Sequence, residues 1–153
     1  MRLAVCLLVL LGMAAACGGD SGLQTATITL ADVAGFGTDL TVELARTQEE
    51  RARGLMNRET LAEDRGMLFV YTADSRETFT MMNTLVPLSI AFVAADGTIL
   101  DVQDMEPLSN GPYSSPRPYR YALEVNQGWF ERHGLDAGDR VEIPPAVTDA
   151  AEE

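Results

Sequence analysis

The chain has 153 residues, which is room for one domain, and 46% of them are hydrophobic, as in an ordinary globular protein. Its 11 basic residues, all arginine, are outnumbered by 23 acidic ones, so the net charge is −12. Such a chain repels phosphate backbones and anionic lipid headgroups, which argues against nucleic-acid binding and charge-driven membrane attachment. The acidity is typical of a solvated surface, and a basic partner is the alternative.

The N-terminus is typical of an exported protein. Arg2 precedes an apolar run of eleven residues, Leu3 to Met13, which is too short to span a bilayer. Ala16 then stands directly before Cys17, and a small residue before a cysteine suits lipoprotein processing. We therefore predict a cleaved signal peptide and a lipidated Cys17, with an unmodified secreted protein as the alternative.

The cysteines are consistent with lipidation. Cleavage would discard Cys6 and leave Cys17 as the sole cysteine, which excludes disulfides, CxxC redox chemistry and thiolate metal sites in the mature chain. We expect export to the periplasmic side of the cell envelope, with the lipid in the outer membrane where the cell has one. The expected organisation is a signal peptide at 1–16, a lipidated N-terminus and tether at 17–24, one globular domain at 25–144 and an acidic tail at 145–153.

The first half of the chain predicts a hairpin, a helix and a buried strand. Alternating apolar residues at 25–30 and 40–44 indicate two paired strands. Thr47 and Glu50 form a capping-box pattern that begins a helix expected from Gln48 to about Asn57. The apolar run from Gly66 to Tyr71 indicates a buried strand.

The second half predicts mostly strands. Asp96-Gly97 is a strong hairpin signal, and the prolines between Pro107 and Pro118 require a long loop. The expected fold class is α+β, a compact and mostly antiparallel curled sheet tending to a barrel, with two short helices. The expected elements are an extended piece at 77–82, strands at 88–93, 98–104, 119–126 and 140–143, and a short helix at 129–133.

Five ordered segments carry a family resemblance. They read EERARGLMNRETLAEDRGMLFVY from Glu49, FTMMNTLVPLSIAFV from Phe79, DGTIL from Asp96, YALEVNQG from Tyr121 and LDAGDRV from Leu135. The chain resembles the family named domain of unknown function 192, from about residue 40 to residue 141. The family consists of small exported or lipid-anchored bacterial proteins. The resemblance implies a compact β-rich domain and no known activity.

The chain departs from the family pattern in the second segment. Thr80 replaces a tryptophan of the family, Met82 a lysine and Ser89 an aspartate. If that lysine and aspartate form a functional ion pair in the family, both halves are missing here.

A polar cluster is the first candidate site. Glu124 lies within an apolar strand, where an ionised carboxylate is costly unless it is paired. Arg51 is the expected mate, since its planar guanidinium matches a carboxylate. Asn83 and Thr84 end a neighbouring apolar segment. The pattern suits either a structural ion pair or exposed strand face, or a polar cluster at a ligand pocket.

The proline-containing loop and the methionines are further candidates. Tyr113, Arg117 and Tyr119 place aromatic and cationic groups in or beside the loop, which is either a lid over a binding site or a plain connection. Met67 and Met81 lie in apolar strands and are expected in the core, although thioethers can also bind Cu(I).

The residue types favour a binding protein over an enzyme. His133 is the only histidine, and the chain has no nucleophile elbow, phosphate loop or zinc motif. We expect no cofactor and no metal site. The leading hypothesis is a non-catalytic envelope module that binds an unknown small ligand or an envelope protein, attached to the membrane by its lipid. The alternatives are an enzyme that uses Glu124 and arginine, and a copper-handling protein.

Overall fold

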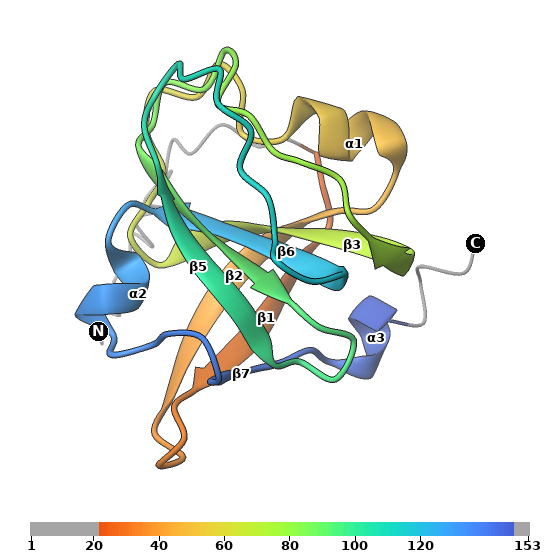
Figure 1. Ribbon diagram of the computed structural model, residues 1–153, viewed down its shortest axis with the longest axis vertical. Helices are drawn as coiled ribbons and strands as arrows, with labels where there is room; N and C mark the ends of the chain where they lie inside the picture. The colour runs from red at the N-terminus through yellow and green to blue at the C-terminus, as the bar shows by residue number, and fades with distance from the viewer. Residues whose placement is uncertain (1–21, 149–153) are drawn as a thin grey trace, which may run out of the picture.

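The computed structural model describes residues 22–148. It contains one seven-stranded sheet with the strand order β5-β4-β6-β3-β2-β1-β7 and three short helices (Figure 1). The strands are β1 (Thr25–Ala31), β2 (Gly37–Ala45), β3 (Arg65–Ser75), β4 (Leu88–Val93), β5 (Ile99–Met105), β6 (Tyr119–Asn126) and β7 (Arg140–Glu142), and the helices are α1 (Gln48–Arg53), α2 (Trp129–Arg132) and α3 (Pro145–Thr148).

The sheet curls into a half-barrel, and all neighbouring pairs but one are antiparallel. The exception is the parallel pair β2–β3, which the connection through α1 makes possible. The curl brings the two edge strands together at one point, where Thr98 and Arg140 form an isolated bridge and the Val141 amide donates to the Gly97 carbonyl at 2.7 Å. The expected curled, mostly antiparallel sheet is therefore confirmed. The sheet dominates the fold, which is not an even mixture of helix and strand.

Helix α1 begins as the sequence predicts and ends earlier. The Thr47 hydroxyl accepts the Glu50 amide at 3.1 Å, and the Glu50 carboxylate accepts the Thr47 amide at 2.9 Å. The helix ends at Arg53 because Gly54 follows with a φ of 48° and a ψ of −135°, a conformation that only glycine adopts readily. The predicted extension to Asn57 is wrong.

Residues 77–82, expected as an extended piece, lie outside the seven strands and make a single isolated bridge, between Phe79 and Tyr113. One other expectation is corrected. Residues 145–148 do not belong to a tail, because they form α3, in which proline suits the first turn and Val147 is buried in the core. The predicted signal peptide, Cys17 and residues 149–153 lie outside the described residues.

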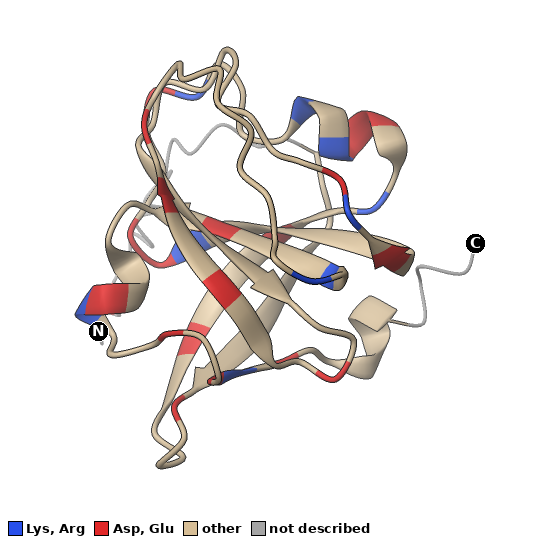
Figure 2. Ribbon diagram, in the orientation of Figure 1, with Lys and Arg blue, Asp and Glu red and all other residues tan. Residues whose placement is uncertain are grey.

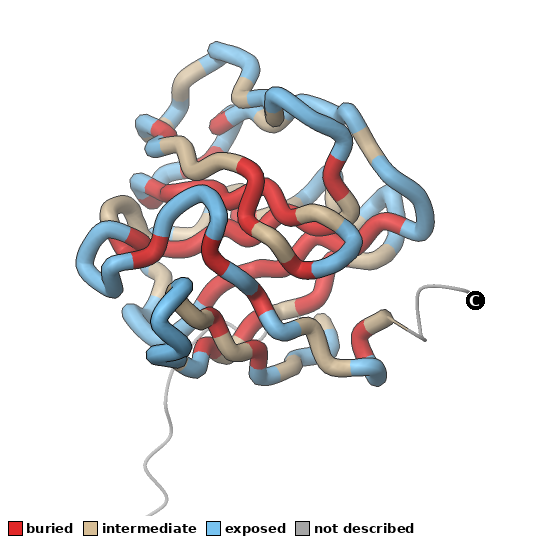
Figure 3. Tube along the Cα trace, turned by 60° about the horizontal axis from the view of Figure 1, so that its bottom comes forward, coloured by how far each residue is buried: buried red, intermediate tan, exposed pale blue. Residues whose placement is uncertain are grey.

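Strand β4, most of β6 and the first half of β3, Gly66–Tyr71, are buried on both faces (Figure 3). Alternate residues of each strand belong to two separate apolar clusters, one on each face. The first cluster includes Leu68 and Leu123 and is covered by α2 and α3. The second cluster includes Met67 and Phe69 and is covered by Leu55, which follows α1, and by Met81. Continuous apolar runs are expected for strands covered in this way.

Charged residues lie around this core. Acidic positions are spread over strands, helices and loops, and α1 carries both signs (Figure 2). Within residues 22–148 there is no helix of the length and hydrophobicity required to cross a membrane.

The point where the sheet edges meet gives a first prediction. Gly97 has a φ of 88°, and a Cβ atom built there would overlap the Val141 carbonyl oxygen. Gly97→Ala should lower the free energy of unfolding by at least about 2 kcal/mol, since a left-handed alanine alone costs about 1–2 kcal/mol. Urea denaturation measures the change. Gly111→Ala is the matched control because nothing lies within 4 Å of its Cβ position, and equal stability of the two variants would contradict the prediction.

Candidate functional site

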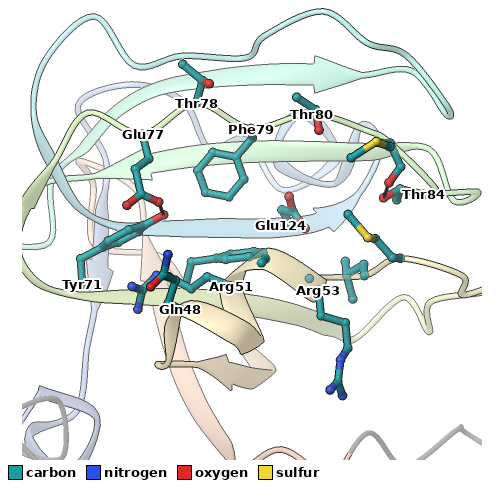
Figure 4. A pocket seen from close by; sticks show the side chains of 16 residues that line it. Gln48, Arg51, Arg53, Tyr71, Glu77, Thr78, Phe79, Thr80, Thr84 and Glu124 are labelled. Carbon is teal, nitrogen blue, oxygen red and sulfur yellow. Dashed lines mark hydrogen bonds between the residues drawn. The ribbon is translucent and has the colours of Figure 1, made fainter.

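A pocket of about 350 Å³ opens over the second cluster, between α1 and the segment that follows β3 (Figure 4). Its volume lies at the small end of the range of ligand sites, about 300–1,000 Å³. Four parts of the chain line the pocket. They are α1 with the residues that follow it, strand β3, residues 77–84 and strand β6. The lining residues are Gln48, Arg51, Ala52, Arg53, Gly54, Leu55, Met56, Phe69, Tyr71, Glu77, Thr78, Phe79, Thr80, Met82, Thr84 and Glu124.

Glu124 forms the deepest polar part of the pocket. It lies on β6 opposite Met67 of β3 and Ile90 of β4, both fully buried, and is itself only 5% exposed. Its carboxyl group has no hydrogen-bond or ion-pair partner among residues 22–148. Burial alone raises the pKa of Glu124 to about 8, so the group is mostly protonated at neutral pH.

Aromatic rings form one wall of the pocket. The rings of Phe69 and Phe79 meet edge to face with centroids 5.0 Å apart. Tyr119 lies behind this wall, packed edge to face against Tyr71 at 5.4 Å. The Tyr71 hydroxyl donates to the Glu77 carboxylate at 3.3 Å, and burial raises the pKa of Tyr71. The wall is thus a rigid apolar surface with a carboxylate at one end.

Arg51 lines the pocket but does not pair with Glu124, so the predicted ion pair is wrong. The Arg51 Nη1 atom donates to the carbonyl oxygens of Arg46 and of Val70, the latter at 3.1 Å. The guanidinium lies over the Tyr71 ring, 4.6 Å from its centroid, and its buried Nε has no partner within the described part of the chain. Arg51 therefore fixes α1 to β3, and its charge is held at the Tyr71 end of the pocket.

The other two residues of the predicted polar cluster have different roles. Thr84 is buried and lines the pocket, and its amide donates to the Met81 carbonyl at 3.1 Å. Asn83 does not line the pocket. It has a φ of 56°, and its carbonyl oxygen accepts the Asn57 amide at 2.8 Å, so it shapes the turn beside the pocket.

The proline-containing loop does not cover the pocket. Tyr113 pairs through its backbone with Phe79, with both N–H···O distances at 2.8 Å, and Gln103 donates to the Ser114 carbonyl at 2.8 Å. Tyr119 is fully buried, and Arg117 is exposed away from the pocket lining. Tyr113 and Tyr119 support the aromatic wall from behind, and the lid interpretation receives no support.

The departures from the family pattern fall on both faces of the sheet. Thr80 and Met82 line the pocket. Ser89 lies on the opposite face, where its hydroxyl donates to Asp104 at 2.5 Å and accepts the Gly128 amide at 2.9 Å. A side chain at position 82 and one at position 89 are therefore separated by the sheet, so the supposed ion pair between these positions does not fit this fold.

The methionines divide into two groups. Met67, Met81 and Met105 are buried in the second cluster, which confirms the expected core role of the first two. Met56 and Met82 line the pocket. No group of three or more His, Cys, Asp or Glu side chains within residues 22–148 could hold a metal ion.

The sequence alone does not reveal the aromatic wall or its acidic end. Its patterns place Phe69 and Tyr71 only in an apolar strand, and Phe79 and Glu77 only in an extended piece. Alternation within one strand could indicate that Phe69 and Tyr71 share a face. Nothing in the sequence indicates that Phe79 returns to meet them, because that contact depends on the irregular path of residues 77–84.

The geometry suits recognition of a small molecule. A flat apolar wall can bind an apolar or ring-bearing group, while Glu124 can donate a hydrogen bond when protonated or bind a cation when ionised. Threonine hydroxyls and the Gln48 amide offer further polar contacts at the rim.

The isolated carboxyl group also gives a stability prediction. The pKa of Glu124 is higher in the folded chain, about 8, than its ordinary value of 4.5. Its contribution to stability is therefore fully present below about pH 4.5 and is lost as the pH rises toward 8, by up to about 1.4 kcal/mol per pH unit. Glu124→Gln should remove this loss. The free energy of unfolding of the variant, relative to that of the wild type, should therefore increase between pH 5 and pH 8 in urea denaturation. Glu131→Gln, an exposed control, should follow the wild type, and a pH-independent difference for Glu124→Gln would contradict the assignment.

Two solved structures closely match this fold. A protein from Sinorhizobium meliloti 1021, provisionally described as a transcription regulator, is 38% identical, with 78% of this chain and 94% of that chain covered and a TM-score of 0.77. A protein of unknown function from Novosphingobium aromaticivorans DSM 12444 is 35% identical, with 82% and 90% covered and a TM-score of 0.78. No curated protein matches the chain.

The family model for DUF192, described as an uncharacterised ACR, matches residues 30–143. This range includes all residues that line the pocket and six of the seven strands in full. The chain belongs to the DUF192 family of uncharacterised proteins.

Proposed function

We propose that the chain is a lipid-anchored module of the cell envelope that binds a small molecule in the pocket over Glu124, without catalysing a reaction. The observation that carries the proposal is Glu124, a residue that is 5% exposed at the base of a pocket with an aromatic wall and whose carboxyl group has no partner among residues 22–148. Such a group lowers the stability of the empty protein at neutral pH. Destabilising polar groups of this kind are typical of functional sites, where they are compensated by a ligand.

The pocket supports binding more than catalysis. The chain's only histidine, His133, stacks on Trp129 at 4.0 Å, and neither residue lines the pocket. The lining has no cysteine or serine. A pocket of this composition can hold a molecule in a defined orientation, but it lacks an activated nucleophile.

An enzyme is the second candidate, and one observation favours it. A carboxyl group with a pKa of about 8 is protonated at neutral pH and could act as a general acid. An acid of this kind would give a rate that falls above about pH 8 on any substrate turned over. If the rate of Glu124→Gln no longer falls above that pH, the fall in the wild type is due to the titration of Glu124.

The ligand proposal is tested by native mass spectrometry of the chain from Gly18 onward, which retains every described residue. We expect a reproducible mass above that of the chain, lost in Glu124→Gln and kept in Glu131→Gln, because only the former removes the carboxyl from the pocket. The same added mass in both variants would place the ligand elsewhere. A bare mass for the wild type would contradict the small-molecule proposal and favour a protein partner.

The anchor is tested separately in cells. Cys17→Ser should move the exported chain from the membrane fraction to the soluble envelope fraction and abolish incorporation of labelled palmitate, because the thiol is the acylated group. An Asp20→Asn variant, three residues away, should remain in the membrane fraction. Unlabelled wild-type chain in the soluble fraction would instead indicate a plain secreted protein.

A further inference from the structure

We infer that the ligand is a small organic cation, an amine whose ammonium group pairs with the Glu124 carboxylate beside the rings of Phe69 and Phe79. This inference rests on the proposed ligand-binding function and specifies the chemical class of the ligand. An anion would be repelled by the Glu124 carboxylate, and an uncharged ligand is the competing possibility that the experiment below distinguishes.

No positively charged side chain of residues 22–148 pairs with the carboxyl at the base of the pocket. The three salt bridges of the described residues join Arg58 to Glu43, Arg120 to Asp74 and Arg132 to Glu63, and none reaches the pocket carboxyl. Glu124 points into the pocket between α1 and the segment that carries Phe79 (Figure 4). A cation bound there would supply the partner that the fold does not, and a charge pair shielded from water is far stronger than one at the surface.

The walls favour an organic cation over a metal ion. The faces of aromatic rings attract ammonium groups, and the pocket already holds one cation in this way, since the Arg51 guanidinium lies 4.6 Å from the centroid of the Tyr71 ring. The rings of Phe69 and Phe79 and the thioethers of Met56 and Met82 offer apolar contacts to a carbon skeleton. A metal ion would find a single carboxylate at this depth, which is too few ligands.

The remaining charges around the pocket do not neutralise Glu124. Arg51 and Arg53 line it from α1, Tyr71 from β3 and Glu77 from the segment after β3, while the neighbours on β3 and β4 are apolar. Arg51 is held by backbone carbonyls and the Tyr71 ring, and Glu77 accepts the Tyr71 hydroxyl. Arginine stays charged at all relevant pH values, so Glu124 alone is expected to titrate with the ligand near neutrality. The net charge of −12 also attracts cations toward the protein.

Cation binding has a characteristic pH dependence. A cation binds the ionised carboxylate, whose fraction falls tenfold for each pH unit below a pKa of about 8. The apparent affinity is reduced by that fraction, so it should rise about tenfold between pH 6 and pH 7 and level off above about pH 8. An uncharged ligand that accepts a hydrogen bond from the protonated carboxyl shows the opposite trend and weakens above that pH.

The experiment compares three probes of one shape: 2-phenylethylamine, 2-phenylethanol and phenylacetate. Each is titrated into the chain from Gly18 onward, labelled with ¹³C in the methionine methyl groups, at pH 6, 7, 8 and 9. The methyl signals of Met56 and Met82 report the pocket, and that of the buried Met105 is the internal reference. We expect saturable shifts of the pocket methyls with the amine only, with the pH dependence given above. Glu124→Gln should weaken amine binding at pH 8 at least tenfold and remove its pH dependence, whereas Glu131→Gln should leave both unchanged.

The outcomes separate the two proposals. Pocket shifts with the alcohol that equal those with the amine, or that strengthen at low pH, would overturn the cation inference and leave the ligand-binding function standing. Amine shifts that persist in Glu124→Gln would also overturn it, because the carboxylate would not be the partner. Shifts with none of the probes between pH 6 and pH 9 would overturn the inference as well. The native mass measured for the purified wild type would then decide whether the chain binds a small molecule.

Discussion

Burial of both faces of β3, β4 and β6 is the constraint on which the rest of the structure depends. A sheet covered on one face could alternate apolar and polar residues. The stretches of these strands that are buried on both faces are instead apolar apart from Ser89 and Glu124, and they are Gly66–Tyr71, Leu88–Val93 and Tyr121–Val125. The covering of the first face comes from α2 and α3, and that of the second from residues around α1 and from the irregular segment after β3. The second covering is incomplete, and the gap that it leaves is the pocket.

The site follows from the one charged residue within these buried stretches, the acid Glu124. Glu124 occupies a position where its strand neighbours are fully buried, yet the incomplete covering above it leaves the carboxyl open to the pocket. If α1 and the segment after β3 met over β6, the same carboxyl would be sealed in the core and would need a fixed partner. The opening in the covering and the isolated acid are thus parts of one arrangement. Arg51 contributes by tying α1 to the Val70 carbonyl of β3, which holds the helix beside that opening.

The sequence predicts local features well and long-range ones poorly. The apolar runs of β3 and β4, the Asp96-Gly97 turn and the Thr47 cap all depend on residues within a few positions of one another. The ending of α1 and the helical turn at Pro145 were missed because glycine and proline at element ends admit more than one continuation. Glu124 was identified from its apolar surroundings, but its partner was assigned wrongly. The geometry that directs Arg51 to backbone carbonyls is set by the parallel pairing of β2 with β3, which no local pattern predicts.

The two-sided burial has a consequence for the chain before it folds. Gly66–Tyr71 and Leu88–Val93 are six-residue stretches without charge or proline, and such segments form cross-β contacts between unfolded copies. In β6 the unfolded chain is interrupted by Glu124, whose carboxyl is ionised once it is exposed to water. The same side chain that weakens the folded core thus acts as a gatekeeper against aggregation in the third strand. The stretches Gly66–Tyr71 and Leu88–Val93 have no charged residue inside them, so in the unfolded state they are the segments most exposed to self-association.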